Sequence, residues 1–497
     1  MEKNPYKKLG GQTLIYGLGT VVPRILNYVI LTVYYTRKLE VQEFGIITEL
    51  YAYISVFIVV LTYGMETGYF KFSIDADRNK LFSTSSLSLI FSSLFFIIIG
   101  FFAAQSIAGF IGYVNFPEYI RWALIIVALD AVTSIFIAKL RIEEKIYKFV
   151  KIQLFNVLLT VVLVVFFLEL LPKYAKSFNG QYFFLGAYRT KVYFIFLANF
   201  LASIIRLLIL FTEYRNVKIR FDFHLLKAIL VYSLPLLAVQ LSGILNESMD
   251  RILLRYFLPS NADKLYQLGI YGANFRIAML MTLFIQMFRY AADPFYFSNY
   301  KSENAKSIYA EVMKYFIIFC MIIFLIVMLY IDAFKYLVDK KFHEGIRIVP
   351  LVLFSSVLTG IIFNLSIWYK LSSKTYYGIY IIGSGTVMSI ILNAIFIPRL
   401  GYYGCALTRL ISAIIMVLMS YFIGQRFYKI DYDLKRIIVY TLLAISIYFI
   451  TDLTTLDNIY FNMIKNTILL LPFIYYVNKR EKLTQIFIKR DGNSNSK

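Results

Sequence analysis

Residues 12–72, QTLIYGLGTVVPRILNYVILTVYYTRKLEVQEFGIITELYAYISVFIVVLTYGMETGYFKF, contain two long hydrophobic segments joined by a short polar connection. Each segment exceeds the roughly 20 helical residues that cross about 30 Å of hydrocarbon. Both segments also contain residues that such helices seldom carry: Pro23, Arg24, Glu49 and Glu66. Insertion scales put an Arg or Asp at a helix centre at about 2.5 to 3.5 kcal/mol unfavourable, so these charges need a structural or functional reason.

Similar apolar stretches recur along all 497 residues with only short polar breaks. Hydrophobic residues make up 60% of the chain and charged residues only 16%, a composition typical of integral membrane proteins. A transmembrane β-barrel would show segments of about ten residues that alternate in polarity, whereas residues 87–102 and 315–330 are apolar on all sides. We therefore expect an all-α integral membrane protein with about 14 transmembrane helices.

The formal net charge of +22 reflects topology rather than a nucleic-acid partner, because most Lys and Arg residues lie in short connections between apolar segments. The termini and alternate connections carry roughly twice as many of them as the opposite set, which places both termini in the cytoplasm. Two isolated cysteines and two isolated histidines predict neither a metal site nor a cofactor. Soluble-enzyme motifs are absent from the sequence and every connection is short, so we expect a protein that is not an enzyme.

The two halves of the chain resemble each other weakly. Residues 14–30, LIYGLGTVVPRILNYVI, align with residues 230–245, LVYSLPLLAVQLSGIL, and the segment that follows each also aligns. Both copies run in the same direction, which is typical of parallel repeats that form two similar bundles around a cleft. Chance alignment of Leu- and Ile-rich helices is the alternative. We expect a six-helix lobe in residues 1–220, a second in residues 221–430, and two further helices with a basic tail in residues 431–497.

Eight charges within or beside the predicted spans are candidate functional residues. One interpretation is a hydrated cavity in which arginines bind an anionic ligand, since guanidinium presents a planar fork that suits phosphate oxygens. Carboxylates would then orient these cations or relay coupling protons. The alternative is that each charge pairs with one on a neighbouring helix or extends to the interface. The candidate cations are Arg24, Arg276, Arg251 and Arg409, and the candidate acids are Glu49, Asp130, Glu247 and Asp250.

Charges close to the span ends favour a structural interpretation. We predict a helix over about residues 228–249. If it extends further, the spacing of Glu247, Asp250, Arg251 and Arg255 puts all four on one helix face. For Arg255 and Glu66 we expect ion pairs or interfacial positions. Lys71 is the nearest basic residue to Glu66 and is its expected partner.

Several local motifs carry a family resemblance. The first-helix segment LIYGLGTVVPRILNYVI, the connection EVQEFGI, the ending LTYGMETGYFKF, and the later stretch from YSLPLL through NESMDRILLRYFL to LGIYGANFRI resemble polysaccharide flippases. These are the Wzx-type exporters of lipopolysaccharide O-antigen and capsule, within the multidrug/oligosaccharidyl-lipid/polysaccharide exporter superfamily. The resemblance implies two six-helix lobes in a V-shaped bundle, two added C-terminal helices and alternating access in a bacterial inner membrane.

The resemblance also implies a cargo of undecaprenyl-diphosphate-linked oligosaccharide and a cavity lined by cations. Membrane lipids, a polysaccharide polymerase and chain-length machinery are candidate partners. Drug exporters of the superfamily usually have an acidic coupling residue in the first helix, whereas the charged residue within this span is Arg24. The alternatives are a multidrug or small-solute cation-coupled antiporter, a lipid II flippase, and a membrane-embedded polysaccharide polymerase or ligase.

Overall fold

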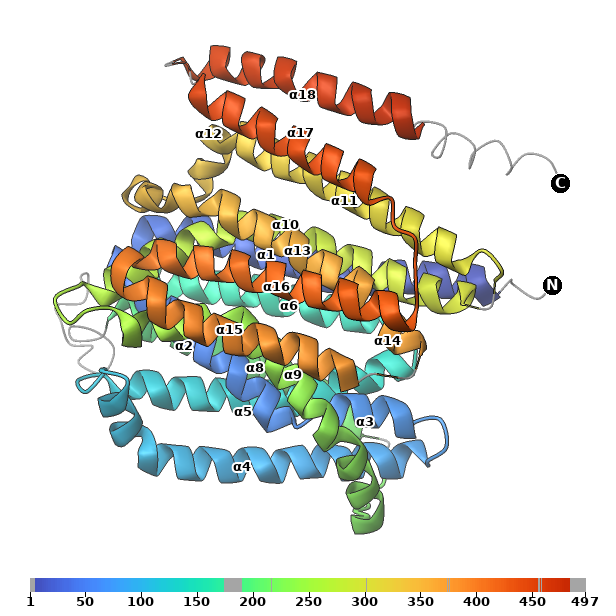
Figure 1. Ribbon diagram of the computed structural model, residues 1–497. Coiled ribbons are helices and arrows are strands. Elements are labelled where there is room, and N and C mark those ends of the chain that lie inside the picture. Colours follow the sequence, from blue (N-terminus) through green and yellow to red (C-terminus); the bar gives the residue numbers. More distant parts are fainter. Residues whose placement is uncertain are drawn as a thin grey trace. The chain divides into compact units, whose positions relative to one another are not determined.

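The computed structural model describes residues 5–482, apart from 174–189 and the single positions 216, 301, 373, 375, 455 and 457. Within these residues the chain is built from helices and contains no strand (Figure 1). Twelve helices of the described part are long and apolar enough to cross a membrane. The expectation of an all-α membrane protein is confirmed, whereas the count of 14 is not, since α1 (Pro5–Lys38) and α18 (Ile459–Glu481) are not among the twelve.

The remaining helices lie within the apolar regions of the sequence, and two of them, Met65–Phe72 and Ile367–Leu371, are short. Their bounds are α2 (Val41–Thr62), α3 (Met65–Phe72), α4 (Arg78–Phe110), α5 (Pro117–Ile142), α6 (Ile146–Val165) with the π-helical turn η1 (Phe166–Leu170), α8 (Lys191–Phe211), α9 (Phe223–Phe257), α10 (Lys264–Asn299), α11 (Ala305–Leu329), α13 (Val349–Leu365), α14 (Ile367–Leu371), α15 (Tyr376–Leu400), α16 (Tyr402–Phe427) and α17 (Leu434–Leu453). Short helical turns are η2 (Thr212–Tyr214), α12 (Ile331–Phe334), η3 (Lys335–Leu337) and η4 (Lys340–Ile348).

The chain divides into two compact units. The first consists of Met1–Ala273 and Gly378–Thr408, and the second of Asn274–Tyr377 and Arg409–Lys497. The helices α10, α15 and α16 each pass from one unit into the other. The division into lobes at residues 1–220, 221–430 and 431–497 stays a prediction.

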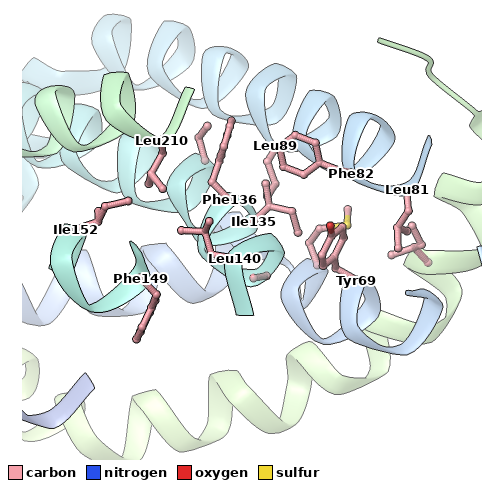
Figure 2. Close-up of a cluster of buried hydrophobic side chains, with 14 of the residues drawn as sticks. Tyr69, Leu81, Phe82, Leu89, Ile135, Phe136, Leu140, Phe149, Ile152 and Leu210 are labelled. Atoms are coloured by element: carbon pink, nitrogen blue, oxygen red, sulfur yellow. The ribbon is translucent and has the colours of Figure 1, made fainter. Parts of the chain in front are cut away.

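A cluster of large apolar side chains holds one end of the first unit together. Figure 2 shows Phe82 of α4 and Phe136 of α5 near its centre, and their rings meet edge to face with centroids 5.2 Å apart. Tyr69 of α3 and Leu210 of α8 belong to the same cluster. Such edge-to-face pairs contribute about 0.5 to 1.5 kcal/mol beyond the apolar area that they bury. The cluster therefore fixes the ends of four helices relative to one another.

The second hydrophobic segment of residues 12–72, expected to be one helix, is divided in the structure. Tyr63 and Gly64 have φ angles of 35° and 72°, which end α2 and start α3. A Cβ on Gly64 would lie 2.8 Å from the carbonyl oxygen of Ser233, so no larger residue fits against α9 at this point. The break thus allows α3 to follow α9 closely, and glycine is required for both the left-handed backbone and the contact.

The second unit anchors the C-terminal helices through a buried carboxylate. Glu481, at the end of α18, accepts hydrogen bonds from Tyr440 of α17 at 2.6 Å and from Arg436 at 3.1 Å. Lys314 of α11 completes the group, with its Nζ 2.5 Å from Glu481 Oε2. Three cationic or hydroxyl donors from two other helices thus compensate the desolvation of one acid.

Candidate functional site

A buried ion pair joins α2 to α9. The side chain of Glu49 is completely buried, and its Oε2 lies 2.8 Å from Arg255 Nη1. Tyr113, in the turn between α4 and α5, donates a hydrogen bond to the same carboxylate oxygen, and the Arg255 guanidinium stacks over the Tyr113 ring at 4.6 Å. Gly112 has φ 80°, and a Cβ there would come within 2.3 Å of Arg255 Nη2. The turn is therefore shaped around this arginine.

A second pair links α5 to α8. Asp130 Oδ1 accepts hydrogen bonds from Arg206 and, at 3.2 Å, from the Ser203 hydroxyl. Arg206 also donates to the Thr133 hydroxyl at 3.2 Å. The structure thus gives Arg206 an acidic partner within the same unit. A coupling role for Asp130 stays a prediction.

The third group of charges lies on α9. Asp250 is 3% exposed and accepts a hydrogen bond from the Tyr271 hydroxyl of α10. Arg251 Nε lies 3.6 Å from Asp250 Oδ1, and Arg251 Nη2 donates to the backbone carbonyl of Glu247 at 2.7 Å. The helix does extend to Phe257, as the spacing of these charges required. The four charges do not share one partner helix, however, because Asp250 contacts α10 whereas Arg255 contacts α2.

The remaining cations belong to different units. Arg24 is an exposed residue of α1 in the first unit. Arg276 of α10 is half-buried in the second unit, where the guanidinium of Arg409 of α16 lies over the Phe275 ring at 4.9 Å. A shared basic cleft formed by Arg24 and Arg276 stays a prediction.

Several hydrogen-bond and ion-pair partners are distant along the chain and could not be predicted from sequence. Glu66 forms an ion pair with Arg141 at 2.8 Å, so the expected pairing with Lys71 is wrong. Tyr113 and Tyr271, which donate to Glu49 and Asp250, carried no signal among the 42 tyrosines. An acid within an apolar helix did indicate that some partner must exist, because an unpaired buried carboxylate is costly.

We expect the replacement Asp130→Asn to lower the free energy of unfolding by about 1 to 3 kcal/mol, because Arg206 is largely buried and loses its charged acceptor. Thermal unfolding of the purified protein in detergent measures this change. The double variant Asp130→Leu with Arg206→Met serves as the control and should recover most of the loss. An unchanged unfolding temperature for Asp130→Asn would contradict the assignment.

Long apolar helices whose buried charges are paired across helices define a polytopic membrane protein. The chain belongs to the polysaccharide biosynthesis protein family, whose model matches residues 9–300. This membership confirms the family resemblance and places the chain in the multidrug/oligosaccharidyl-lipid/polysaccharide exporter superfamily. None of the curated proteins matches the chain.

Solved structures of transporters share the fold. A structure described as lipid II flippase MurJ in an inward closed conformation has a TM-score of 0.70 and 15% identity, covering 94% of this chain and 99% of its own. A MATE structure in the straight conformation gives 0.58 and 16% identity, over 86% of this chain and 98% of that chain. An outward-facing multidrug resistance MATE family transporter gives 0.54 and 15%, over 86% and 96%. The expectation of a transporter rather than an enzyme is confirmed by this family and fold.

Proposed function

We propose that this protein is a flippase that moves an undecaprenyl-diphosphate-linked oligosaccharide from the cytoplasmic to the periplasmic leaflet of a bacterial inner membrane. The product would supply surface polysaccharide such as O-antigen, capsule or exopolysaccharide. Membership of the polysaccharide biosynthesis protein family is the observation that carries this proposal. The common fold with MurJ, a lipid II flippase by its description, supports a lipid-linked cargo.

The chemistry of such a cargo explains why cations are needed within the membrane. Moving a diphosphate bare through hydrocarbon costs far more than thermal energy supplies. A wet cavity lined by Arg24, Arg276, Arg251 and Arg409 would replace water around the phosphate oxygens with guanidinium donors. The polyprenyl tail would stay in the lipid, and alternating access of two bundles would expose the head group to the other side.

The candidate acids have a secondary role in this proposal. Glu49, Asp130, Glu247 and Asp250 would keep cations oriented or relay coupling protons as the bundles move. Glu49, Asp130 and Asp250 have ion-pair partners in the structure, which supports an orienting role at least as well as a coupling role.

We expect Arg24→Ala and Arg276→Ala each to reduce the delivery of surface polysaccharide at least tenfold in a cell that lacks its own flippase, since loss of a charged hydrogen bond of about 1.5 to 3 kcal/mol corresponds to about this factor. Arg121→Ala is the matched control. Arg121 lies near the start of α5, stacks over Phe101 and is not one of the candidate cations. Protein levels are measured in parallel. Full rescue by both variants at normal protein levels would exclude the proposed cation roles.

The leaflet in which single lipid-linked units accumulate tests the proposed function itself. Deletion of the gene should leave these units on the cytoplasmic leaflet, whereas deletion of a polymerase or ligase leaves them on the periplasmic leaflet. The fold of the MurJ structure favours a lipid II flippase as the second candidate. A block in peptidoglycan synthesis on depletion would support that candidate, and transport of organic cations down an ion gradient in vesicles would support an antiporter.

A further inference from the structure

A cavity of about 450 Å³ lies within the first unit, and none of the candidate cations of the transport site is among its lining residues. The end of α5, the start of α6 and the turn η2 after α8 surround it, and its charged lining residues are Lys139, Lys145, Lys148, Arg215, Glu143 and Glu213. Four cations therefore face two acids. Such an excess of positive charge in an open pocket is complementary to an anion.

Both acids of the cavity, Glu143 and Glu213, form ion pairs with lysines. Glu213 is 7% exposed and is contacted by Lys148, by Lys145 at 3.2 Å and by Lys139 at 3.6 Å. Glu143 contacts Lys145 at 2.7 Å and Lys139 at 3.8 Å. Each ammonium group has three donors, so Lys145, which contacts two of these carboxylates, and Lys148, which contacts one, retain hydrogen-bonding capacity towards the cavity. Hydrogen bonding to Glu143 raises the pKa of Lys145, which keeps this side chain charged at neutral pH.

Lys145, Lys148 and Arg215 are the cations that can reach a ligand. The side chains of Lys145 and Lys148 are 45% and 42% exposed. Arg215 is exposed as well, and its guanidinium forms no ion pair with any residue in the described parts of the chain. The planar guanidinium of Arg215, together with two ammonium groups, suits the tetrahedrally arranged oxygens of a phosphate. The first turn of α6 lacks a side-chain cap, and its backbone N–H groups add positive potential nearby.

The surroundings of the cavity indicate a membrane boundary. The apolar span of α5 ends at Ile142, that of α6 begins at Ile146, and that of α8 ends at Tyr214. Tyr147 and Phe211, which are next in sequence to the lining residues Lys148 and Thr212, are 76% and 50% exposed. Exposed aromatic residues beside basic residues at helix ends are typical of the head-group region of a bilayer.

We propose that this cavity binds the phosphate of an anionic membrane phospholipid, with Arg215, Lys145 and Lys148 as its ligands and the acyl chains on the side of Tyr147 and Phe211. The bound lipid would link the ends of α5, α6 and α8. A soluble phosphate compound has the same anionic chemistry, but it would not account for the exposed aromatic residues next in sequence to the lining residues. The cavity shares no lining residue with the cargo site of the proposed function, so the two can be tested independently.

Binding of phosphatidylglycerol to the full-length protein, measured by native mass spectrometry, tests the proposal. We expect the affinity to fall at least tenfold in the double variant Lys145→Gln with Arg215→Gln, because each cation near the head group contributes substantially to the binding of an anionic lipid. Arg215→Gln alone should lose part of the affinity without disturbing the fold, as it removes no described ion pair. Lys151→Gln with Lys218→Gln is the matched control, with two exposed lysines that do not line the cavity.

The phosphatidylglycerol-binding experiment distinguishes a lipid site from nonspecific binding and from a site for a soluble anion. A loss of affinity for phosphatidylglycerol in the double variant but not in the control, with unchanged thermal unfolding in phosphatidylcholine, supports the proposal. Equal affinity for phosphatidylglycerol in the double variant and in the matched control overturns it. Equal binding of phosphatidylcholine and phosphatidylglycerol by the wild-type protein also overturns it. Competition of inorganic phosphate with the lipid at similar concentrations would assign the cavity to a soluble anion and would also overturn it.

Discussion

The replacement Arg255→Gln is expected to lower the free energy of unfolding by about 3 to 5 kcal/mol, because it leaves Glu49 as a buried charge without a cationic partner. Glu49 is completely buried, and Arg255 is 13% exposed. The carboxylate oxygen Oε1 of Glu49 has no hydrogen-bond partner among the described residues. The hydrogen bonds from Arg255 and Tyr113 that offset the burial of this carboxylate both go to Oε2.

Thermal unfolding in detergent, followed by tryptophan fluorescence, measures this loss. The double variant Glu49→Leu with Arg255→Met removes both charges together and should recover most of the stability. Arg121→Gln is the single-site control, because this arginine has an aromatic contact and no buried acidic partner in the described part of the chain. An unfolding temperature for Arg255→Gln within the error of the wild-type value would show that Glu49 is already protonated or hydrated.

The replacement Gly269→Ala is expected to destabilise the protein by about 3 kcal/mol, the upper part of the usual range for overpacking. A Cβ at Gly269 of α10 would lie 2.0 Å from the carbonyl oxygen of Val41 of α2. A Cβ at Gly45 would lie 2.1 Å from the carbonyl oxygen of Leu265. Backbone oxygens cannot move aside as the end of a side chain can, so the two helices must separate. Small residues at such crossings are typical of membrane helices, where close packing supplies much of the association energy.

Gly243→Ala in α9 provides a control with the opposite expected sign. A Cβ at Gly243 has open space around it, and Ala is favoured over Gly within a helix by about 1 kcal/mol. Measured unfolding temperatures should therefore fall for Gly269→Ala and rise or stay unchanged for Gly243→Ala. If both substitutions had the same effect, the close contact between α2 and α10 would not be a feature of the folded protein in detergent.

The helices could be predicted from sequence because hydropathy and length are local properties. The apolar residues 87–102 lie within α4, and residues 315–330 coincide with the second half of α11 apart from the last residue. The break between α2 and α3 was missed, since Gly64 within an apolar run is compatible with a continuous helix. Its contact with Ser233, which is distant along the chain, explains why glycine is needed there.

The charged residues show how far the candidate site could be predicted. Their positions within apolar segments correctly marked Glu49, Asp130 and Asp250 as residues that need partners. Proximity along the chain nevertheless gave the wrong partner for Glu66, because Lys71 was preferred to Arg141. For Arg255 the expected ion pair is present, but its partner Glu49 lies on α2, 206 residues away, and could not be named from sequence.

The sequence by itself determined that this protein is an all-α membrane protein of the polysaccharide biosynthesis family, because apolar length and local motifs are visible without knowledge of contacts. Only the tertiary structure decided which charge compensates which. Glu49 and Arg255 are 206 residues apart, and their contact exists because α2 packs along α9. A buried charge requires a partner on energetic grounds, but the identity of that partner depends on how the helices pack.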